Sequence, residues 1–282
     1  METGLQLFGR LTSRPSIARI STTLFPNDLK QKEVVEISGD PASGKTHLLT
    51  SLIATCILPS NYEGFCIGGL QAGVIFLNTD LHFQIFKLVT ILDYRLKHCR
   101  NADGSCLNPS QIENIIKSSL ENLHIYDCAN TFVLRITIHS LQQTIASNPK
   151  ISLIVLDSVS ANYWQDVHQG GTRKIDLYTD KILKFLQKIV TDFNLSIIYT
   201  RPTYFKSMSS KVNRNVSQHP LIGFINHKIE LRRPTAHAES GVVFFRAEIR
   251  CHDKVVFKYY KNKLDGFEWI ELDALPNQTT ND

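Results

Sequence analysis

The sequence predicts an α/β fold in which a mostly parallel, twisted sheet carries helices on both faces. Three observations lead to this class. Strand and helix patterns alternate from residue 33 to residue 200, a phosphate-binding loop separates the first strand from the first helix, and four strand-like runs follow residue 200. Alternation of this kind is typical of parallel sheets, because consecutive parallel strands need a crossover connection, which is usually a helix.

The composition is that of a globular protein. A length of 282 residues permits one large α/β domain or two small ones, and 43% hydrophobic residues supply a substantial core. No run of 18 apolar residues and no signal peptide is present, so we expect a soluble, intracellular protein without a membrane partner. The six cysteines form no C-x-x-C pair and the ten histidines no cluster, so we expect reduced thiols and no zinc site.

Short apolar runs rich in β-branched residues predict the strands, and longer runs with helical periodicity predict the helices. The expected strands are 34–37, 74–79, 123–126, 151–156 and 195–200, and the expected helices lie near 45–57, 82–98, 110–120, 132–146 and 175–193. Residues 1–30 are too few for a domain, so we expect a lead-in or partner-docking segment there, an ATPase core over 31–272 and a flexible tail over 273–282.

The pattern changes after residue 200. Residues 203–220 are polar and contain no acid, and the strand-like runs that follow are 223–231, 242–250, 254–260 and 267–271. The turns between these runs are short, which predicts antiparallel hairpins that extend the same sheet.

The phosphate-binding loop is the strongest motif of the chain. It consists of Gly39, Asp40, Pro41, Ala42, Ser43, Gly44, Lys45 and Thr46, and it matches G-x-x-x-x-G-K-[ST] at every fixed position. Its backbone N–H groups cradle phosphate oxygens at a helix N-terminus. Lys45 would reach the β- and γ-phosphates, and the Thr46 hydroxyl would bind Mg²⁺. The alternative, a glycine turn with an incidental lysine, is disfavoured by the strand before the loop and the helix after it. The motif predicts binding of ATP with Mg²⁺.

Two acids follow predicted strands. Asp157 ends the apolar run 151–156, as expected of a Walker B strand whose carboxylate holds Mg²⁺, although an Asp in an ordinary strand-ending turn is the alternative. Asp80 follows the run 74–79, where related ATPases usually carry a glutamate that orients the attacking water. Its side chain is one methylene shorter, and misplacing a catalytic group by about 1 Å can cost ~10²-fold in rate. We therefore expect Asp80 to be at most a weak base.

Basic residues are concentrated after residue 200. Residues 201–263 contain 13 lysines and arginines against 4 acids. A solvated basic face is one interpretation, and a polyanionic partner, above all nucleic acid, is the other.

The motifs resemble a known family. The phosphate-binding loop, residues 77–83 and residues 151–161 resemble the ATPase core of RecA-type recombinases, and residues 56–60, 76–96 and 154–171 are similar to the eukaryotic recombinase paralogues. The resemblance implies a RecA-like fold, a nuclear role in homologous recombination repair of double-strand breaks, and other paralogues as partners, the D paralogue first, within a four-paralogue complex. It also implies that the N-terminal helical DNA-binding domain of the recombinases is missing, because the phosphate-binding loop begins at residue 39.

The sequence departs from the recombinase pattern at two places. Arg201 and Pro202 stand where recombinases carry Asn-Gln before their second DNA loop, and Gln84 stands where an arginine stacks on adenine. Together with Asp80, these departures favour a subunit that binds ATP and hydrolyses it slowly or not at all.

Two loops correspond to the DNA loops of the recombinases and predict contacts with single-stranded or branched DNA. The candidate residues are Arg173 and Lys174 in the first loop and Lys206, Lys211 and Arg214 in the second. A solvated loop is the alternative for 203–220. Tyr163 and Trp164 are candidates for stacking on bases, but we expect them to pack beneath the first loop.

The favoured hypothesis is a recombinase paralogue with little or no ATPase activity. The alternative is an active DNA-dependent ATPase that remodels recombinase filaments and takes an arginine from a partner subunit. A small-molecule P-loop kinase is disfavoured, because the basic residues do not form an arginine-rich lid.

Overall fold

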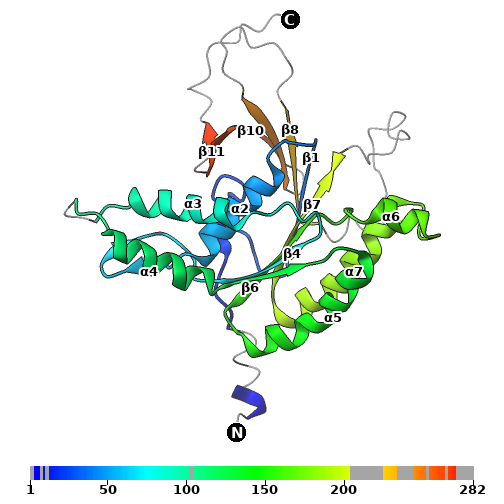
Figure 1. The fold of residues 1–282 in the computed structure, drawn as a ribbon, viewed down its shortest axis with the longest axis horizontal. Helices are drawn as coiled ribbons and strands as arrows, with labels where there is room; N and C mark the ends of the chain where they lie inside the picture. The colour runs from blue at the N-terminus through cyan, green and yellow to red at the C-terminus, as the bar shows by residue number, and fades with distance from the viewer. Residues whose placement is uncertain are drawn as a thin grey trace, which may run out of the picture.

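The computed structural model describes residues 3–6, 9, 13–101, 104–203, 225–233, 244–251, 254–263 and 266–270. Its main feature is a nine-stranded sheet of order β11-β10-β9-β8-β1-β7-β6-β4-β5 (Figure 1). The strands that run parallel to their neighbours are β1 (Val34–Gly39), β4 (Gly73–Asn78), β5 (Leu123–Asp127), β6 (Ile151–Asp157) and β7 (Ser196–Pro202). The predicted mostly parallel sheet is confirmed.

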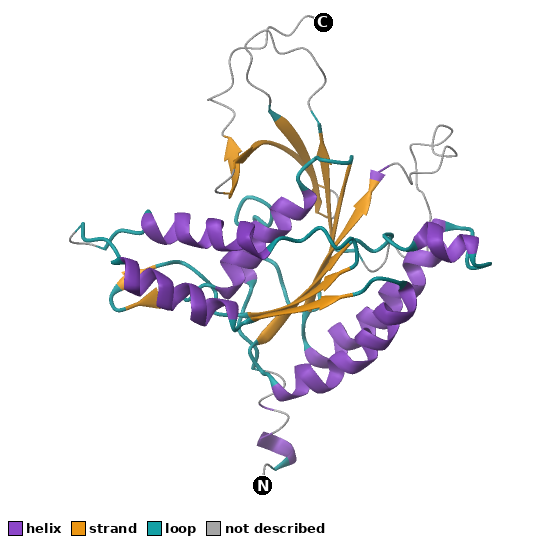
Figure 2. Cartoon of the chain, viewed as in Figure 1, coloured by secondary structure: helices purple, strands orange, loops and turns teal. Residues whose placement is uncertain are grey.

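Helices cover the parallel strands on both faces, as predicted (Figure 2). On one face lie α2 (Lys45–Ile57), α3 (Ile85–Lys97) and α4 (Pro109–Leu120), and on the other α5 (Thr131–Ser147), α6 (Tyr163–His168) and α7 (Ile175–Phe193). Residues of β6 alternate between the two hydrophobic clusters: Leu153 and Val155 face the first group of helices, and Ile154 and Leu156 the second. Strands that are buried on both faces need continuous apolar runs, which is why their positions were predictable.

Local signals fix the helix ends. Asn108 caps α4 in a capping box with Gln111, and Pro109 occupies the first turn. The Asn130 side chain accepts a hydrogen bond from the backbone N–H of Val133 at the start of α5. The sequence analysis did not predict α6, the 3₁₀ turn η1 (Ala18–Ile20) or the short hairpin of β2 (Asn61–Tyr62) and β3 (Phe65–Cys66). Among the described residues, none of the helices combines the length and the apolar character that a membrane span requires.

The segment before β1 is attached to the core. Its apolar side chains, which are at most 3% exposed, are Ile17, Ile20, Leu24, Phe25 and Leu29. The Arg14 guanidinium donates to the carbonyl oxygens of Phe193 and Ile151 at 2.7 Å and of Ile145 at 3.1 Å. Because Phe193 and Ile145 lie in the last turns of α7 and α5, Arg14 places a positive charge at the negative ends of two helix dipoles. The boundary at residue 30 stays a prediction, but residues 14–29 carry part of the packing.

The C-terminal strands extend the sheet. β8 (His227–Arg232) pairs with β1 in parallel, which the sequence analysis did not predict. β9 (Phe245–Cys251), β10 (Lys254–Lys263) and β11 (Gly266–Ile270) then follow as antiparallel partners, as expected. Tyr260 of β10 is fully buried and its ring stacks on Phe245 and Phe267. This aromatic cluster joins the C-terminal strands to the helix face that holds α2.

Candidate nucleotide-binding site

The phosphate-binding loop runs from the end of β1 to the start of α2. Steric contacts explain why glycine occupies two of its positions. A Cβ atom at Gly39 would lie 2.6 Å from the Leu231 carbonyl oxygen, and one at Gly44 would lie 2.7 Å from the Asn262 side-chain amide. Gly44 also has a left-handed backbone, with φ 91°. The loop therefore depends on glycine both for its conformation and for the close approach of the C-terminal strands.

Lys45 lies at the first position of α2, with its ammonium group turned onto the loop. Its Nζ donates to the carbonyl oxygens of Gly39 at 3.0 Å and of Asp40 at 2.9 Å. Burial lowers the pKa of Lys45, while the carboxylates of Asp157, Asp80 and Asp40 oppose this shift. The lysine is therefore a partly desolvated cation, which makes a nearby anion favourable.

Thr46 and Asp157 meet beside the loop. The Thr46 hydroxyl donates to Asp157 Oδ2 at 2.7 Å, and the Thr200 hydroxyl at the end of β7 donates to Asp157 Oδ1. Asp157 is only 4% exposed. A hydroxyl and a carboxylate are hard oxygen ligands of the kind that Mg²⁺ prefers, so the two residues that the sequence predicted as metal ligands fit the ion.

Asp80 follows β4 and reaches the same site. The backbone N–H groups of Thr79 and Asp80 donate to the Asp157 carbonyl oxygen at 2.9 and 3.1 Å, which ties the ends of β4 and β6 together. Burial raises the pKa of the Asp80 carboxyl, and the neighbouring charge of Asp157 raises it further, against the opposing effects of Ser158, His82 and Lys45. Lys45, Asp80 and Asp157 thus interact electrostatically at one edge of the sheet.

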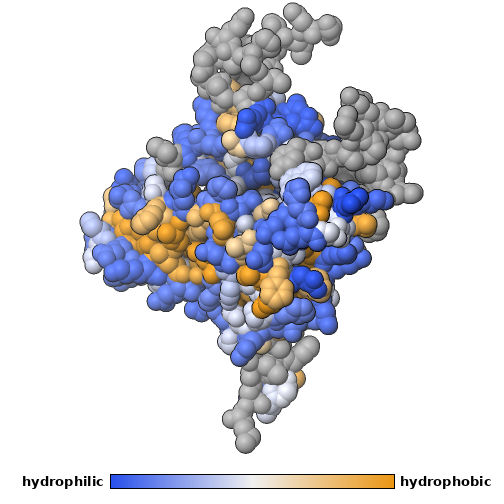
Figure 3. All heavy atoms as spheres, turned by 45° about the vertical axis from the view of Figure 1, so that its right-hand side comes forward, coloured by the Kyte–Doolittle hydropathy of each residue, from blue (hydrophilic) through white to orange (hydrophobic). Residues whose placement is uncertain are grey.

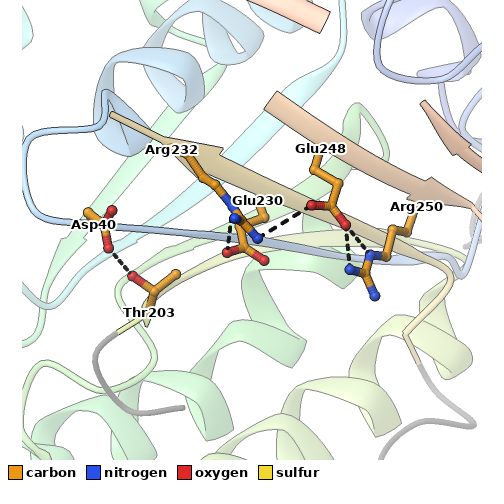
Figure 4. A network of polar contacts seen from close by, with 6 residues as sticks. All are labelled: Asp40, Thr203, Glu230, Arg232, Glu248 and Arg250. Atoms are coloured by element: carbon orange, nitrogen blue, oxygen red, sulfur yellow. Dashed lines mark hydrogen bonds and ion pairs between the residues drawn. The ribbon is translucent and has the colours of Figure 1, made fainter. Parts of the chain in front are cut away.

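Residues that follow β7 in the chain donate hydrogen bonds to the phosphate-binding loop. The sequence analysis did not predict these contacts. The Tyr260 hydroxyl donates to the Ser43 carbonyl oxygen at 2.7 Å, and the Arg233 guanidinium donates to the Pro41 carbonyl oxygen. The Thr203 hydroxyl donates to the Asp40 carboxylate (Figure 4). No short-range pattern predicts these contacts, because the tyrosine and the loop lie 217 residues apart in the chain.

The residues that depart from the recombinase pattern have other partners. Arg201 makes an ion pair with Asp176 of α7 at 2.7 Å. Pro202 ends β7 beside Gly39, and Gln84 is an exposed residue just before α3. The prediction that Arg201, Pro202 and Gln84 do not supply the groups that recombinases use at these places stays a prediction.

The predicted DNA-contact residues are only partly described. Arg173 and Lys174 are exposed between α6 and α7, where the Tyr163 hydroxyl donates to the Arg173 carbonyl oxygen at 2.5 Å. Tyr163 is buried as expected, but the prediction that Trp164 packs beneath the loop is wrong, because Trp164 is 56% exposed. Lys206, Lys211 and Arg214 lie outside the described residues.

The sheet order and the phosphate-binding loop define a RecA-like core. The crystal structure of the RadB recombinase superposes with a TM-score of 0.62 at 19% identity and covers 92% of this chain and 99% of the recombinase, which shows the fold. The Rad51 family model matches residues 18–233. The chain belongs to the Rad51 family.

Curated relatives narrow the position within the family. The chain is 30% identical over 235 residues to "DNA repair protein XRCC2" of Mus musculus, a match that covers 82% of this chain and 78% of the relative. It is 24% identical to "DNA repair protein XRCC2 homolog" of Arabidopsis thaliana, over 77% of this chain and 67% of the relative. To "DNA repair protein RAD51 homolog 2" of Homo sapiens it is 26% identical, over 71% and 50%. The predicted resemblance to the eukaryotic recombinase paralogues is confirmed, and the similarity to XRCC2 proteins places the chain among them.

Proposed function

We propose that this chain is a recombinase-paralogue subunit of a DNA repair complex that promotes homologous recombination repair of double-strand breaks. The proposal is supported by membership of the Rad51 family and by relatives that are named as DNA repair proteins. It includes a nuclear location and binding of single-stranded or branched DNA, in part through Arg173 and Lys174.

Binding of ATP with Mg²⁺ is the biochemical basis of the proposal. The observation that carries it is the convergence of Lys45, Thr46 and Asp157 at the carboxyl ends of β1 and β6. The backbone N–H groups at the start of α2 and the Lys45 ammonium would bind the phosphates, since both attract anions. Thr46 and Asp157 would hold Mg²⁺, which neutralises charge on the phosphate oxygens when it is bound.

Weak or absent hydrolysis is proposed for two reasons. Asp80 is one methylene shorter than the glutamate usual at this position, so its carboxylate would lie farther from the attacking water. Arg201 and Pro202 replace the Asn-Gln pair, and Arg201 is paired with Asp176 instead. Nucleotide would then act mainly as a structural ligand.

The test of this site is Lys45→Ala. We expect at least a tenfold loss of affinity for ATP–Mg²⁺, measured by calorimetry, because the variant lacks the charge that faces the phosphates. The control is Lys97→Ala, which removes an exposed lysine of α3 that pairs with its neighbour Asp93. Unchanged affinity in Lys45→Ala contradicts the assignment. Turnover by the wild-type chain at the rate of an active recombinase, with single-stranded DNA present, contradicts weak hydrolysis.

Other recombinase paralogues are the proposed partners, with the D paralogue first, in a four-paralogue complex. Exposed apolar side chains on both faces of the sheet support contacts with other chains: Phe86 of α3 is 82% exposed, and Phe132 and Ile136 of α5 are 72% and 53% exposed. Figure 3 shows hydrophobic residues gathered in patches among hydrophilic ones on one side of the molecule. Co-purification of the chain with each paralogue separately tests the partner, and capture of another paralogue but not the D paralogue contradicts the specific choice.

One observation favours the alternative, an active DNA-dependent ATPase that remodels recombinase filaments. Asp80 lies within electrostatic reach of both Lys45 and Asp157, so a carboxylate is available at the site. Turnover that appears only after addition of a partner subunit supports this alternative, since the partner would then complete the site.

A further inference from the structure

Three neighbouring C-terminal strands share one face of the sheet. Residues that pair across strands project on the same side, so the registers assign nine side chains to this face. They are Lys228, Glu230 and Arg232 of β8, Arg250, Glu248 and Arg246 of β9, and Val255, Phe257 and Tyr259 of β10. We call this set the open sheet face.

The open sheet face is accessible in the described part of the chain. Val255 is 48% and Phe257 47% exposed, and the side chains of Arg232 and Arg250 are 43% and 56% exposed. On the opposite side of the same strands Ile229, Leu231, Ala247 and Tyr260 are fully buried, although Val256 near the start of β10 is 40% exposed. The exposed Val255 and Phe257 of β10 are hydrophobic groups that the described fold leaves in contact with water.

Positive charge exceeds negative charge on this face. Both acids are engaged by arginines of the face itself: Arg232 contacts Glu230 at 3.2 Å and Glu248 at 3.5 Å, and Arg250 contacts Glu248 (Figure 4). Lys228 and Arg246 have no ion pair with any described residue. The Arg246 guanidinium lies over the Phe257 ring, 5.3 Å from its centroid. An exposed aromatic ring therefore stands among cations whose charge the acids only partly offset.

This combination matches the chemistry of a single nucleic-acid strand. Its phosphates require cations, and its unpaired bases stack on aromatic rings, whereas a duplex keeps the faces of its bases inside. Sheet faces with exposed aromatic residues bind single strands in this way in RNA-recognition modules. A merely solvated charged face requires the arginines but gives no reason for a half-exposed phenylalanine beneath one of them.

We propose that the open sheet face binds single-stranded nucleic acid, with a base stacked at Phe257 and phosphates held by Lys228, Arg246 and the arginines beside Glu248. We expect little dependence on base sequence, because every base can stack on an aromatic ring and every nucleotide carries a phosphate. The inference rests on the DNA-binding part of the proposed function, but it adds a second contact region to the loop of Arg173 and Lys174.

The test uses the full chain and a fluorescent oligothymidine. We expect Phe257→Ala to weaken binding about 5- to 150-fold, which is the range for loss of one stacked base. Phe257→Trp retains an aromatic plane and should bind like the wild type. Arg246→Gln should reduce the slope of log affinity against log salt by about 0.7, the value for one phosphate contact on a single strand. The matched controls are Phe86→Ala and Lys150→Gln, an exposed aromatic residue of α3 and an exposed lysine before β6.

The outcomes separate this inference from the function it rests on. If the wild-type chain binds no oligothymidine, the DNA-binding proposal fails and the inference fails with it. If Arg173→Gln with Lys174→Gln abolishes binding while the Phe257 and Arg246 variants bind like the wild type, the inference alone is overturned. A second experiment does not depend on the folding of any variant: the wild-type chain is photocrosslinked to an oligonucleotide that contains 5-iodouracil. Adducts on β9 or β10 support the inference, and adducts confined to residues 163–174 overturn it.

Discussion

The two halves of the sheet differ in how their strands are covered, and this difference separates two kinds of site. β6 is buried along its whole length between two layers of helices. β9 in the other half alternates between side chains of the open sheet face, such as Arg246 and Arg250, and core residues such as Ala247 and Ile249. A strand that is buried on both sides can offer functional groups only beyond its end, while a strand covered on one side offers them along its length.

The charged residues follow this rule. Lys45, Asp80 and Asp157 lie where β1, β4 and β6 end, held by buried strands that leave their backbone little freedom. Side chains held at fixed positions beyond strand ends suit a small charged ligand, because each can contact one charged group of that ligand. The arginines of β8 and β9 are spread over a surface, which suits an extended polyanion. In our proposals, the same sheet would carry a phosphate site in one half and a face that binds single-stranded nucleic acid in the other.

The largest expected contrast comes from one substitution made in both halves. Val155→Ala in β6 removes a side chain that is 1% exposed, and we expect it to lower the free energy of unfolding by about 2 kcal/mol. Val255→Ala in β10 removes one that is 48% exposed, and the loss should stay below about 0.5 kcal/mol. Urea denaturation of the two variants measures both. Equal losses would mean that the open sheet face is covered in solution.

A smaller effect tests the contact between the halves. Tyr260→Phe keeps the ring but removes the hydroxyl that donates to the Ser43 carbonyl oxygen, and we expect a loss of about 1 kcal/mol. Affinity for ATP–Mg²⁺ should fall a few-fold as well, because Ser43 belongs to the phosphate-binding loop. The control is Tyr259→Phe, the neighbouring residue on the open sheet face, which should change neither quantity. If stability falls while nucleotide affinity is unchanged, the hydrogen bond from Tyr260 to Ser43 stabilises the fold but does not contribute to nucleotide binding.

The sequence predicted what local patterns determine. The apolar run 151–156 and the helical period of 175–193 match β6 and α7 within one residue, and the phosphate-binding motif placed Lys45 at a helix start. Contacts between distant segments were not predictable. The parallel pairing of Val35 with His227, the carbonyl contacts of Arg14 and the Tyr260 hydrogen bond each join segments separated by more than a hundred residues. Propensity carries no information about such pairs, since tertiary packing selects them. The prediction for Trp164 was wrong for a related reason. An aromatic residue beside a loop can face the core or the solvent, and the local sequence does not distinguish the two.

The smallest effect concerns the electrostatics of the phosphate site. Because burial and Asp157 raise the pKa of Asp80 above its usual 3.8, the folded state holds this proton more tightly than the unfolded state does. Above pH 3.8 the carboxyl of Asp80 is ionised in the unfolded chain but keeps its proton in the folded chain until the pH reaches the raised pKa. The free energy of unfolding of the wild type therefore falls as the pH rises through this interval. Asp80→Asn removes the titrating carboxyl, so this contribution to the pH dependence of stability is absent from the variant.

Asp80→Asn should therefore melt at a higher temperature than the wild type at pH 7.5, and the difference should shrink as the pH is lowered toward 3.8. Differential scanning calorimetry from pH 7.5 to pH 5 measures this trend in buffers without nucleotide. The control is Asp93→Asn, which removes an exposed carboxylate that pairs with Lys97 and should not raise the melting temperature. A lower melting temperature for Asp80→Asn at pH 7.5 would show that the fold stabilises the ionised carboxylate.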